Sequence, residues 1–580
     1  MSTRPISEAE RDELIAVAET LLRSGAKPRG LDGTVAALGQ VKSRSGVPLS
    51  RGAIHGRFAS IKRIWGISPD FSLYQPPEPV YGTETVPEQK QEPVLEGKVE
   101  SHPILKVAQQ EGVRRFILTC AQNNTKIHEA VWANLLVAAE YYDAEIMVSR
   151  FTYNKAAYGS GSVKPGTKQA SDAENLWYDP AIEPYQCDNR VELAPGLVFC
   201  GEQNILPTAI RPLSGFESYT GRASGIFPHV KFAMESVASG KFSATKYNWT
   251  TGTVTQRNYI QKKAGLKADF HHAYGALLVE VDGDGDWFVR QLNARDSDGS
   301  ICDLTIKIEG GQVFENMTIE SINWFDIHRD VMDEDIYEIS WKPGGILDTL
   351  KPRFQFFHDL LMFRSRGHHD VKNPHKMFER FVEGGDVVED EIQSCADFLV
   401  SAHRDWCLSI IVDSNHDNHV TQWLRETDYR NDPVNAIFFL EAQLEKYRSI
   451  MKGAGKQFHL IEWAMRKYGC PPEDRFLRED ESFIICPDAS GGIECGMHGH
   501  LGTNGSRGNP KQFARMGRKA NTGHTHSAGI TDGVYTAGAS SLDMDYNVGP
   551  SSWSHSFVVT YCNGKRSVIT IWDKKWRVGK

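Results

Sequence analysis

The chain has 580 residues, of which 40% are hydrophobic and 24% charged, and its formal net charge is −9. This length exceeds what one hydrophobic core supports and predicts about two to four domains of an ordinary globular protein. No apolar run approaches the ~20 residues of a membrane span, and the first residues lack the apolar core of a signal peptide. Ten scattered cysteines form no CxxC pair. We therefore expect a cytoplasmic protein with reduced thiols and no membrane partner.

Residues 1–70 have the pattern of a small helical domain. Helices are predicted at 7–24, which starts with a capping-box pattern, at 31–42 and at 51–65. Residues 21–69 hold nine Lys or Arg and a single acid, although the whole chain is acidic. Three short helices with a basic third one resemble a helix-turn-helix DNA-binding module; the alternative is a protein-interaction domain with a solvated charged face. The candidates to contact DNA are Arg51, Arg57, Lys62 and Arg63.

Residues 71–100 have the composition of a flexible linker, rich in Pro and Glu and poor in apolar side chains. The following region, 101–317, begins with a strand–helix–strand pattern and is predicted to be an α/β domain without an assigned role. Asp282, Asp284 and Asp286 have a calcium-like spacing. Because their segment is short and lies between two predicted strands, we interpret it as a hairpin turn.

Five blocks of metal-ligand residue types follow in the remainder of the chain. The last is Gly523-His524-Thr525-His526. On an extended backbone both histidines would leave the same face, roughly 6.6–7 Å apart, and reach neighbouring ions. The four earlier blocks are Asp326-Ile327-His328, Asp359, Asn415-His416-Asp417 and the loop holding His498. Each block alone is more typical of ordinary structure, but together, each near a predicted strand end, they indicate a metal centre.

The order Asp-x-His, Asp, Asn-His-Asp, His and His-x-His resembles the calcineurin-like metallophosphoesterase superfamily over about residues 318–575. The resemblance implies an α/β fold in which two face-to-face sheets flanked by helices carry a two-metal site, and it defines a catalytic domain at 318–580. In the family pattern, one ion would be held by Asp326, His328 and His526, the other by Asn415, His498 and His524, with Asp359 bridging the two and His416 protonating the leaving oxygen.

Two ligand positions have alternatives. His500 lies on the same loop as His498, and Asp370 competes with Asp359, although only Asp359 directly follows a predicted strand. A ligand set of oxygen and imidazole without thiolate favours two Mn²⁺ ions, with Fe, Zn and Mg as alternatives.

A basic segment separates the last two blocks. Residues 504–523 hold five Lys or Arg and no acid. Arg507, Lys511 and Arg515 are candidates to contact a phosphodiester backbone; the alternative is the solvated face of a helix predicted at 509–519.

Short phrases at 504–508 and 542–550 look like tailed-phage metallophosphoesterases of the pre-early DNA-transfer type. That resemblance implies a phage-encoded nuclease that degrades DNA in the host cytoplasm.

The predicted function is therefore a Mn²⁺-dependent, two-metal phosphodiesterase that acts as a DNA nuclease, with DNA as its partner. One alternative is a phosphomonoesterase acting on nucleotides or phosphoproteins. Another is a non-catalytic DNA-binding phage protein, which is favoured by His358 and Ser414 standing where the family usually has glycine. The sequence leaves open whether the chain forms homo-oligomers and whether cleavage is endo- or exonucleolytic.

Overall fold

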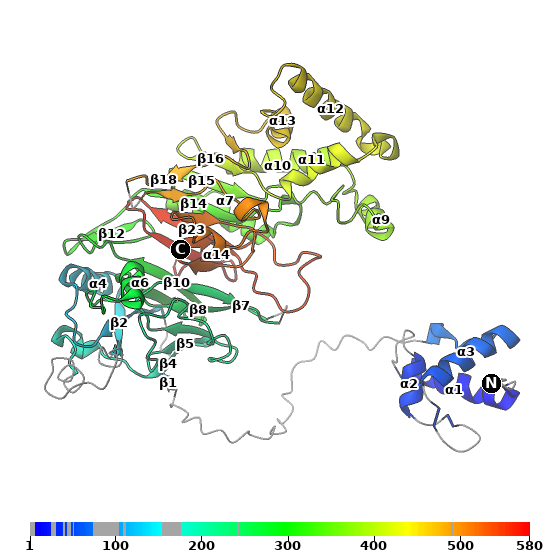
Figure 1. Ribbon diagram of the computed structural model, residues 1–580, viewed down its shortest axis with the longest axis horizontal. Helices are drawn as coiled ribbons and strands as arrows, with labels where there is room; N and C mark the ends of the chain where they lie inside the picture. The colour runs from blue at the N-terminus through cyan, green and yellow to red at the C-terminus, as the bar shows by residue number, and fades with distance from the viewer. Residues whose placement is uncertain are drawn as a thin grey trace. The chain divides into compact units, whose positions relative to one another are not determined.

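The chain folds into two compact units, Met1–Glu100 and Ser101–Lys580 (Figure 1). The computed structural model describes residues 6–24, 31–38, 41–42, 48–49, 51–73, 104–107, 112–153, 176–240, 243–488 and 491–579. Apart from residues 71–73, the predicted linker at 71–100 lies outside these ranges.

The described residues of the first unit form three helices, α1 (Glu8–Arg23), α2 (Leu31–Leu38) and α3 (Arg51–Trp65). Their shared core includes Leu14 of α1, Val35 of α2 and Ile54 of α3, all buried. Within α1, Leu14, Ala18 and Leu22 recur at helical spacing and form its buried face. On α3, Lys62 and Arg63 are exposed, whereas Arg57 is half-buried with its guanidinium 3.9 Å from Glu10. Arg51 is the first residue of α3. The role of these basic residues in binding DNA stays a prediction.

A six-stranded sheet organises the C-terminal half of the second unit. Its order is β17 (Arg475–Leu477), β16 (Leu408–Val412), β15 (Phe354–His358), β14 (Ile319–Asp326), β23 (Ser556–Tyr561) and β24 (Arg566–Thr570). The first four strands are parallel, and β23 and β24 are antiparallel to their neighbours. The parallel arrangement brings the carboxyl ends of β14, β15 and β16 to one edge.

Both faces of this sheet are covered, as expected of parallel strands with nearly continuous apolar sequence. On one face, sheet residues such as Trp324 and Phe357 pack with helix residues such as Trp341 in the largest core. The helices of that side are α7 (Glu334–Trp341), α8 (Ile346–Leu350), α10 (Val388–Ala402), α11 (Asp417–Glu426), α12 (Ala436–Met451) and α13 (Leu460–Lys467). On the other face, Phe356 and Ile410 pack with Ile493 of a second sheet.

That second sheet has eleven strands. Its order is β1 (Leu105–Lys106), β4 (Arg190–Ala194), β5 (Leu197–Cys200), β6 (Ser224–Phe227), β8 (Lys246–Thr250), β7 (Met234–Val237), β21 (Gly529–Thr531), β22 (Val534–Thr536), β20 (Lys519–Thr522), β19 (Ile493–Glu494) and β18 (Ile484–Ile485). The first six strands precede residue 317 and the last five follow it. The join is the antiparallel pairing of β7 with β21, in which Gly529 lies opposite Glu235.

Two smaller sheets and several short elements complete the unit. The four-stranded sheet has the order β10 (Trp287–Asn293), β9 (Gly275–Val281), β2 (Arg114–Gln122) and β3 (Ala144–Phe151), and the three-stranded one has the order β11 (Ile301–Asp303), β12 (Ile306–Glu309) and β13 (Gln312–Phe314). The remaining α-helices are α4 (Glu129–Tyr142), α6 (Lys263–His271), α9 (Pro374–Glu383) and α14 (Pro510–Phe513). Short 3₁₀ turns are η1 (Phe71–Leu73), η3 (Pro180–Tyr185), η4 (Arg329–Val331), η5 (Tyr429–Asn431), η6 (Pro433–Asn435) and η7 (Thr503–Gly505).

The prediction of a mixed α/β protein is confirmed, but two finer expectations need correction. The boundary expected at 317 divides one continuous sheet, because β7 and β21 exchange backbone hydrogen bonds across it. The helix expected at 509–519 is reduced to α14, since the chain turns after Phe513 and passes through the left-handed Gly517.

None of the ten cysteines is paired, and eight are buried. Among the described residues, no helix has the length and apolar character needed to cross a membrane.

Candidate metal centre

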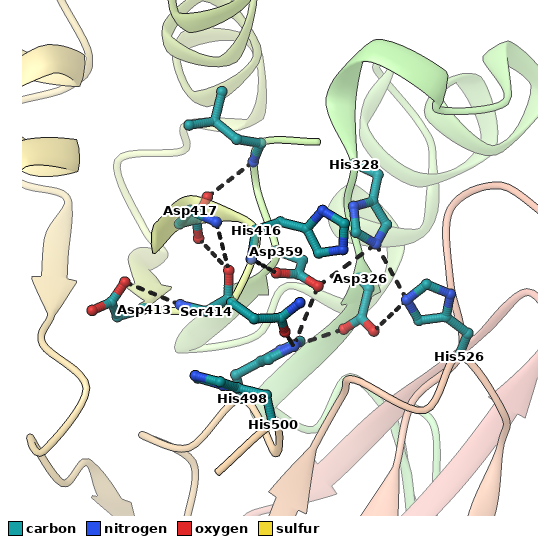
Figure 2. Close-up of polar contacts among 12 residues, drawn as sticks. Asp326, His328, Asp359, Asp413, Ser414, His416, Asp417, His498, His500 and His526 are labelled. Carbon is teal, nitrogen blue, oxygen red and sulfur yellow. Dashed lines mark hydrogen bonds and ion pairs between the residues drawn. The ribbon is translucent and has the colours of Figure 1, made fainter. Parts of the chain in front are cut away.

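The candidate site lies where β14 and β15 end side by side. Asp326 closes β14 and pairs in register with His358, the last residue of β15, so that Asp359 follows immediately beside it. Asn415 and His416 come after β16, at the start of α11, and His526 comes after β20. Figure 2 shows the side chains from these separate segments converging on one buried point.

Four of the predicted ligands form a compact cluster, Asp326, His328, Asp359 and His526, with one donor atom from each within 4.8 Å of the others. Nε2 of His328 lies 3.2 Å from Nε2 of His526, and that nitrogen lies 3.2 Å from Oδ2 of Asp326. Two nitrogen ligands of one ion, each ~2.1 Å from it, are separated by roughly 3.4 Å in tetrahedral geometry. The observed spacing therefore suits one shared cation.

The carboxylates of the cluster lack ordinary partners. Both carboxylate oxygens of Asp326 and Oδ2 of Asp359 are buried and accept no hydrogen bond within the described ranges. Imidazole nitrogens lie near them without hydrogen-bond geometry, as is expected when donors point at a common centre rather than at each other. Buried carboxylates are nearly always neutralised or hydrogen-bonded, so the donor set fits a divalent cation.

The backbone is unusual at these positions. His328, Asp359, His524 and His526 all have a left-handed backbone, with φ between 44° and 69°. Such values are uncommon for non-glycine residues and concentrate at functional sites, where they aim side chains. The extended step expected for His524–His526 is therefore wrong, because β20 ends at Thr522 and the chain turns at both histidines.

His498 and Asn415 adjoin the cluster on the other side of Asp359. Nε2 of His498 lies 3.3 Å from Oδ2 of Asp359 and 3.1 Å from Oδ1 of Asn415. The His524 ring packs edge-on against that of His498, with centroids 5.2 Å apart. Asp359 thus has histidines from both predicted ligand groups within 3.6 Å of Oδ2, since His328 Nε2 is 3.6 Å away.

The two alternative ligands have other partners. Nε2 of His500 lies 3.2 Å from Oε1 of Glu479. The Asp370 carboxylate pairs with Lys376 at 3.5 Å. The geometry therefore favours His498 and Asp359, and their binding of metal stays a prediction.

The electrostatics of the cluster follow from burial and from its mixture of charges. Burial alone would raise the pKa of Asp359, but His498 and His416 bring it well below its usual value. For His498, the lowering by burial is outweighed by Asp359 and Asp326, which raise its pKa to about 9. Burial lowers the pKa of His328 to about 3. The two carboxylates are thus anionic at neutral pH, and His328 offers a neutral imidazole.

His416 stands beside this cluster with a fixed ring. Its backbone N–H donates to Oδ1 of Asp359 at 3.2 Å, and its Nδ1 lies 3.2 Å from the carbonyl oxygen of Met362. Donation from Nδ1 to that carbonyl sets the tautomer and leaves Nε2 available for proton transfer.

Several supporting residues are visible only in the structure. An added Cβ at Gly523 would meet Oδ1 of Asp326 at 2.0 Å, which explains why glycine precedes the His-x-His segment. The ring of Trp553 packs edge-on against His526 with centroids 4.2 Å apart. Asp417 accepts hydrogen bonds from the backbone of Leu361 and from Ser414, and burial and Asp359 raise its pKa to about 7. Asp417 was recognisable as part of the Asn-His-Asp block, but its positioning role was not.

The basic segment joins the ligand loop directly. The N–H of Gly508 donates to the carbonyl of His500 at 2.7 Å, and Arg507, Lys511 and Arg515 are exposed. Their contact with a phosphodiester backbone stays a prediction.

The Asp282, Asp284 and Asp286 cluster is an internal ion-pair network. Nζ of Lys575 lies 2.7 Å, 3.3 Å and 2.7 Å from the three carboxylates in turn. An ammonium group thus occupies the place that a calcium ion would take, in agreement with our interpretation of a hairpin turn.

Fold and site together define an α/β protein with a buried Asp/His cluster able to hold a metal ion. The chain is 40% identical over 478 residues to Protein A1 of Escherichia phage T5, a match that covers 80% of this chain and 83% of that protein. The chain therefore belongs to the same family as phage T5 Protein A1. No protein-family model matches it, and no solved structure matches it.

Proposed function

We propose that this protein is a two-metal phosphodiesterase of the metallophosphoesterase type that hydrolyses DNA in the infected host cell. The observation that carries the proposal is the convergence of Asp326, His328, Asp359 and His526 at buried strand ends, with unpartnered carboxylate oxygens. The order of ligand blocks and a phage relative support it. We infer Mn²⁺ as the favoured ion because oxygen and imidazole donors occur without thiolate.

Two divalent ions held here would polarise a phosphate and lower the pKa of water. The side chains of the protein would hold the ions in position and supply a proton to the leaving oxygen. Asp359 lies between the two ligand groups and is held by the His416 backbone, so it is placed to be shared. Nε2 of His416 would deliver a proton to the leaving oxygen, because its Nδ1 is engaged with Met362.

A polymer substrate is supported by the exposed basic segment next to the His498 loop. A phosphomonoester needs no such surface, whereas a DNA strand would gain contacts with Arg507, Lys511 and Arg515. The basic helix α3 of the first unit offers a further candidate contact through Lys62 and Arg63.

The decisive experiment compares linear, circular and single-stranded DNA with p-nitrophenyl phosphate, each with Mn²⁺ and with chelator. We expect metal-dependent cleavage of DNA. Hydrolysis of p-nitrophenyl phosphate alone would favour a phosphomonoesterase. No hydrolysis by metal-loaded protein would favour a non-catalytic DNA-binding protein.

A further inference from the structure

A second group of possible metal ligands lies at α11 and consists of histidines alone. Its members are His368, His369 and His419, here called the histidine trio. One ring nitrogen of each lies within 4.8 Å of the other two. Ring centroids are 3.8 Å apart for His368 and His369 and 4.4 Å apart for His368 and His419. None of the three belongs to the ligand set described above.

Two ring nitrogens of the trio are buried and lack hydrogen-bond partners within the described part of the chain. Nδ1 of His368 and Nδ1 of His419 are buried and have no hydrogen-bond partner among the residues that the structure describes. Burial, with the neighbouring histidines, lowers the pKa of His419 to about 3 and also lowers that of His368. A buried imidazole nitrogen without a hydrogen bond destabilises the folded protein, and coordination of a cation would satisfy its lone pair.

The segments that carry the trio are firmly held. His419 lies in the first turn of α11, and its N–H donates to the carbonyl of His416 at 3.0 Å. Next to His368, the guanidinium of Arg366 makes two 2.7 Å hydrogen bonds to the Asp432 carboxylate. The loop and the helix are therefore anchored independently, and the three rings meet without needing each other for support.

We propose that the histidine trio binds one borderline divalent cation of the Zn²⁺ class, separate from the Asp326/Asp359 centre. Three neutral imidazoles select Zn²⁺, Cu²⁺, Co²⁺ or Ni²⁺ over Mn²⁺ and Mg²⁺, which prefer oxygen. His369 is exposed, so water reaches the site and can complete the coordination. The two centres thus differ in the ion they prefer.

An ion at the trio would act on the neighbouring chemistry through His416. The His416 ring contacts His419 at 4.9 Å and His328 at 4.7 Å between centroids, so it links the trio to the main cluster. A bound cation would join the first turn of α11 to the 363–370 loop and so add a constraint on His416 besides its contacts with Asp359 and Met362.

The test uses the full chain saturated with excess Mn²⁺, titrated with Zn²⁺ and then desalted for elemental analysis of both metals. Because Zn²⁺ binds nitrogen and oxygen ligands more tightly than Mn²⁺, we expect some exchange at the Asp326/Asp359 centre in every variant. The ion of the trio is therefore measured as about one Zn²⁺ more per chain in the unaltered protein than in the variants of the trio. His369→Ala and His419→Ala should weaken Zn²⁺ binding at least about tenfold. His375→Ala, the same change at an exposed histidine nearby, should leave Zn²⁺ binding unaltered.

Equal Zn²⁺ binding in all four proteins would overturn the proposal, as would no Zn²⁺ binding in the unaltered chain. Since His369 is exposed, its replacement does not threaten folding. The experiment measures bound metal and not DNA cleavage. Its result is therefore independent of the proposed nuclease activity.

Discussion

The backbone N–H of His416 donates a 3.2 Å hydrogen bond to Oδ1 of Asp359. The residue proposed to transfer a proton is therefore tied to the carboxylate proposed to be shared by two ions, and the tie does not involve the His416 side chain. Side-chain replacement at His416 can thus separate proton transfer from metal binding.

His416→Ala is expected to lower the rate of DNA hydrolysis about 10²- to 10⁴-fold, which is the usual contribution of a positioned acid or base. Mn²⁺ affinity should stay nearly constant, because the backbone bond to Asp359 remains. The hydrolysis rate is measured as turnover on a defined duplex, and the Mn²⁺ affinity is measured by titration of the same preparation. Turnover equal to that of a His375→Ala control would remove His416 from the mechanism.

Gly523→Ala tests the close approach of backbone and ligand. The added methyl would lie 2.0 Å from Oδ1 of Asp326, so the carboxylate must move. We expect Mn²⁺ affinity to fall at least about tenfold. At Gly529, an added Cβ meets only the Met234 carbonyl at 3.5 Å, an ordinary contact, so Gly529→Ala is the matched control. Equal Mn²⁺ affinities for Gly523→Ala and Gly529→Ala would contradict the assignment of Asp326 as a metal ligand.

The basic segment is tested by the triple change Arg507→Ala, Lys511→Ala and Arg515→Ala. If these side chains contact phosphates, KM for duplex DNA should rise and the salt dependence of binding should weaken by roughly 2–3 in logarithmic slope. Hydrolysis of p-nitrophenyl phosphate, if present, should be unaffected.

The control for this experiment removes the same charge elsewhere. Lys351, Arg353 and Lys574 are exposed outside the basic segment. Their triple replacement by alanine should leave the salt slope near that of the unaltered protein. Equal slopes for both triple variants would show that only net charge matters.

The local sequence pattern predicts an element well where one face is apolar or where a capping residue marks its start. The helix predicted at 51–65 coincides with the observed α3, Arg51–Trp65. The convergence of Asp326, His328 and Asp359 is also predictable, since each lies at or just after the carboxyl end of one of two adjacent parallel strands.

Non-local pairing and backbone strain were not predictable in this way. Nothing near Gly529 indicates that it would pair with Glu235, almost 300 positions earlier, so the boundary at 317 was misplaced. Left-handed φ values at His524 and His526 arise from tertiary packing around the cluster and leave no local signal. The sequence gives no signal for the histidine trio, because His419 is fifty positions from His369 and the fold alone brings them together.

The last prediction concerns stability at a distance from the site. Arg290 is buried beside two carboxylates: its Nε and Nη2 lie 2.7 Å and 2.9 Å from the Asp303 oxygens, and its Nη1 donates to Glu280. Arg290→Met would remove the partner that the two buried carboxylates share, and Glu280 would keep Arg115 at 3.0 Å and the backbone N–H of Val578 at 3.4 Å. We expect a loss of about 3–5 kcal/mol in the free energy of unfolding, measured by urea titration of the full chain.

Arg295→Met provides the comparison, because Arg295 is 53% exposed and its pairing with Asp298 is solvated. That change should alter stability by less than about 0.5 kcal/mol. Burial and charge also give a pH dependence: Arg290 holds the pKa of Glu280 below its usual value against the opposing effect of burial. Its stabilisation is therefore present at neutral pH and is lost as pH falls through the lowered pKa. A similar urea midpoint for Arg290→Met and Arg295→Met at neutral pH would mean that the network contributes little to holding β10 against β9.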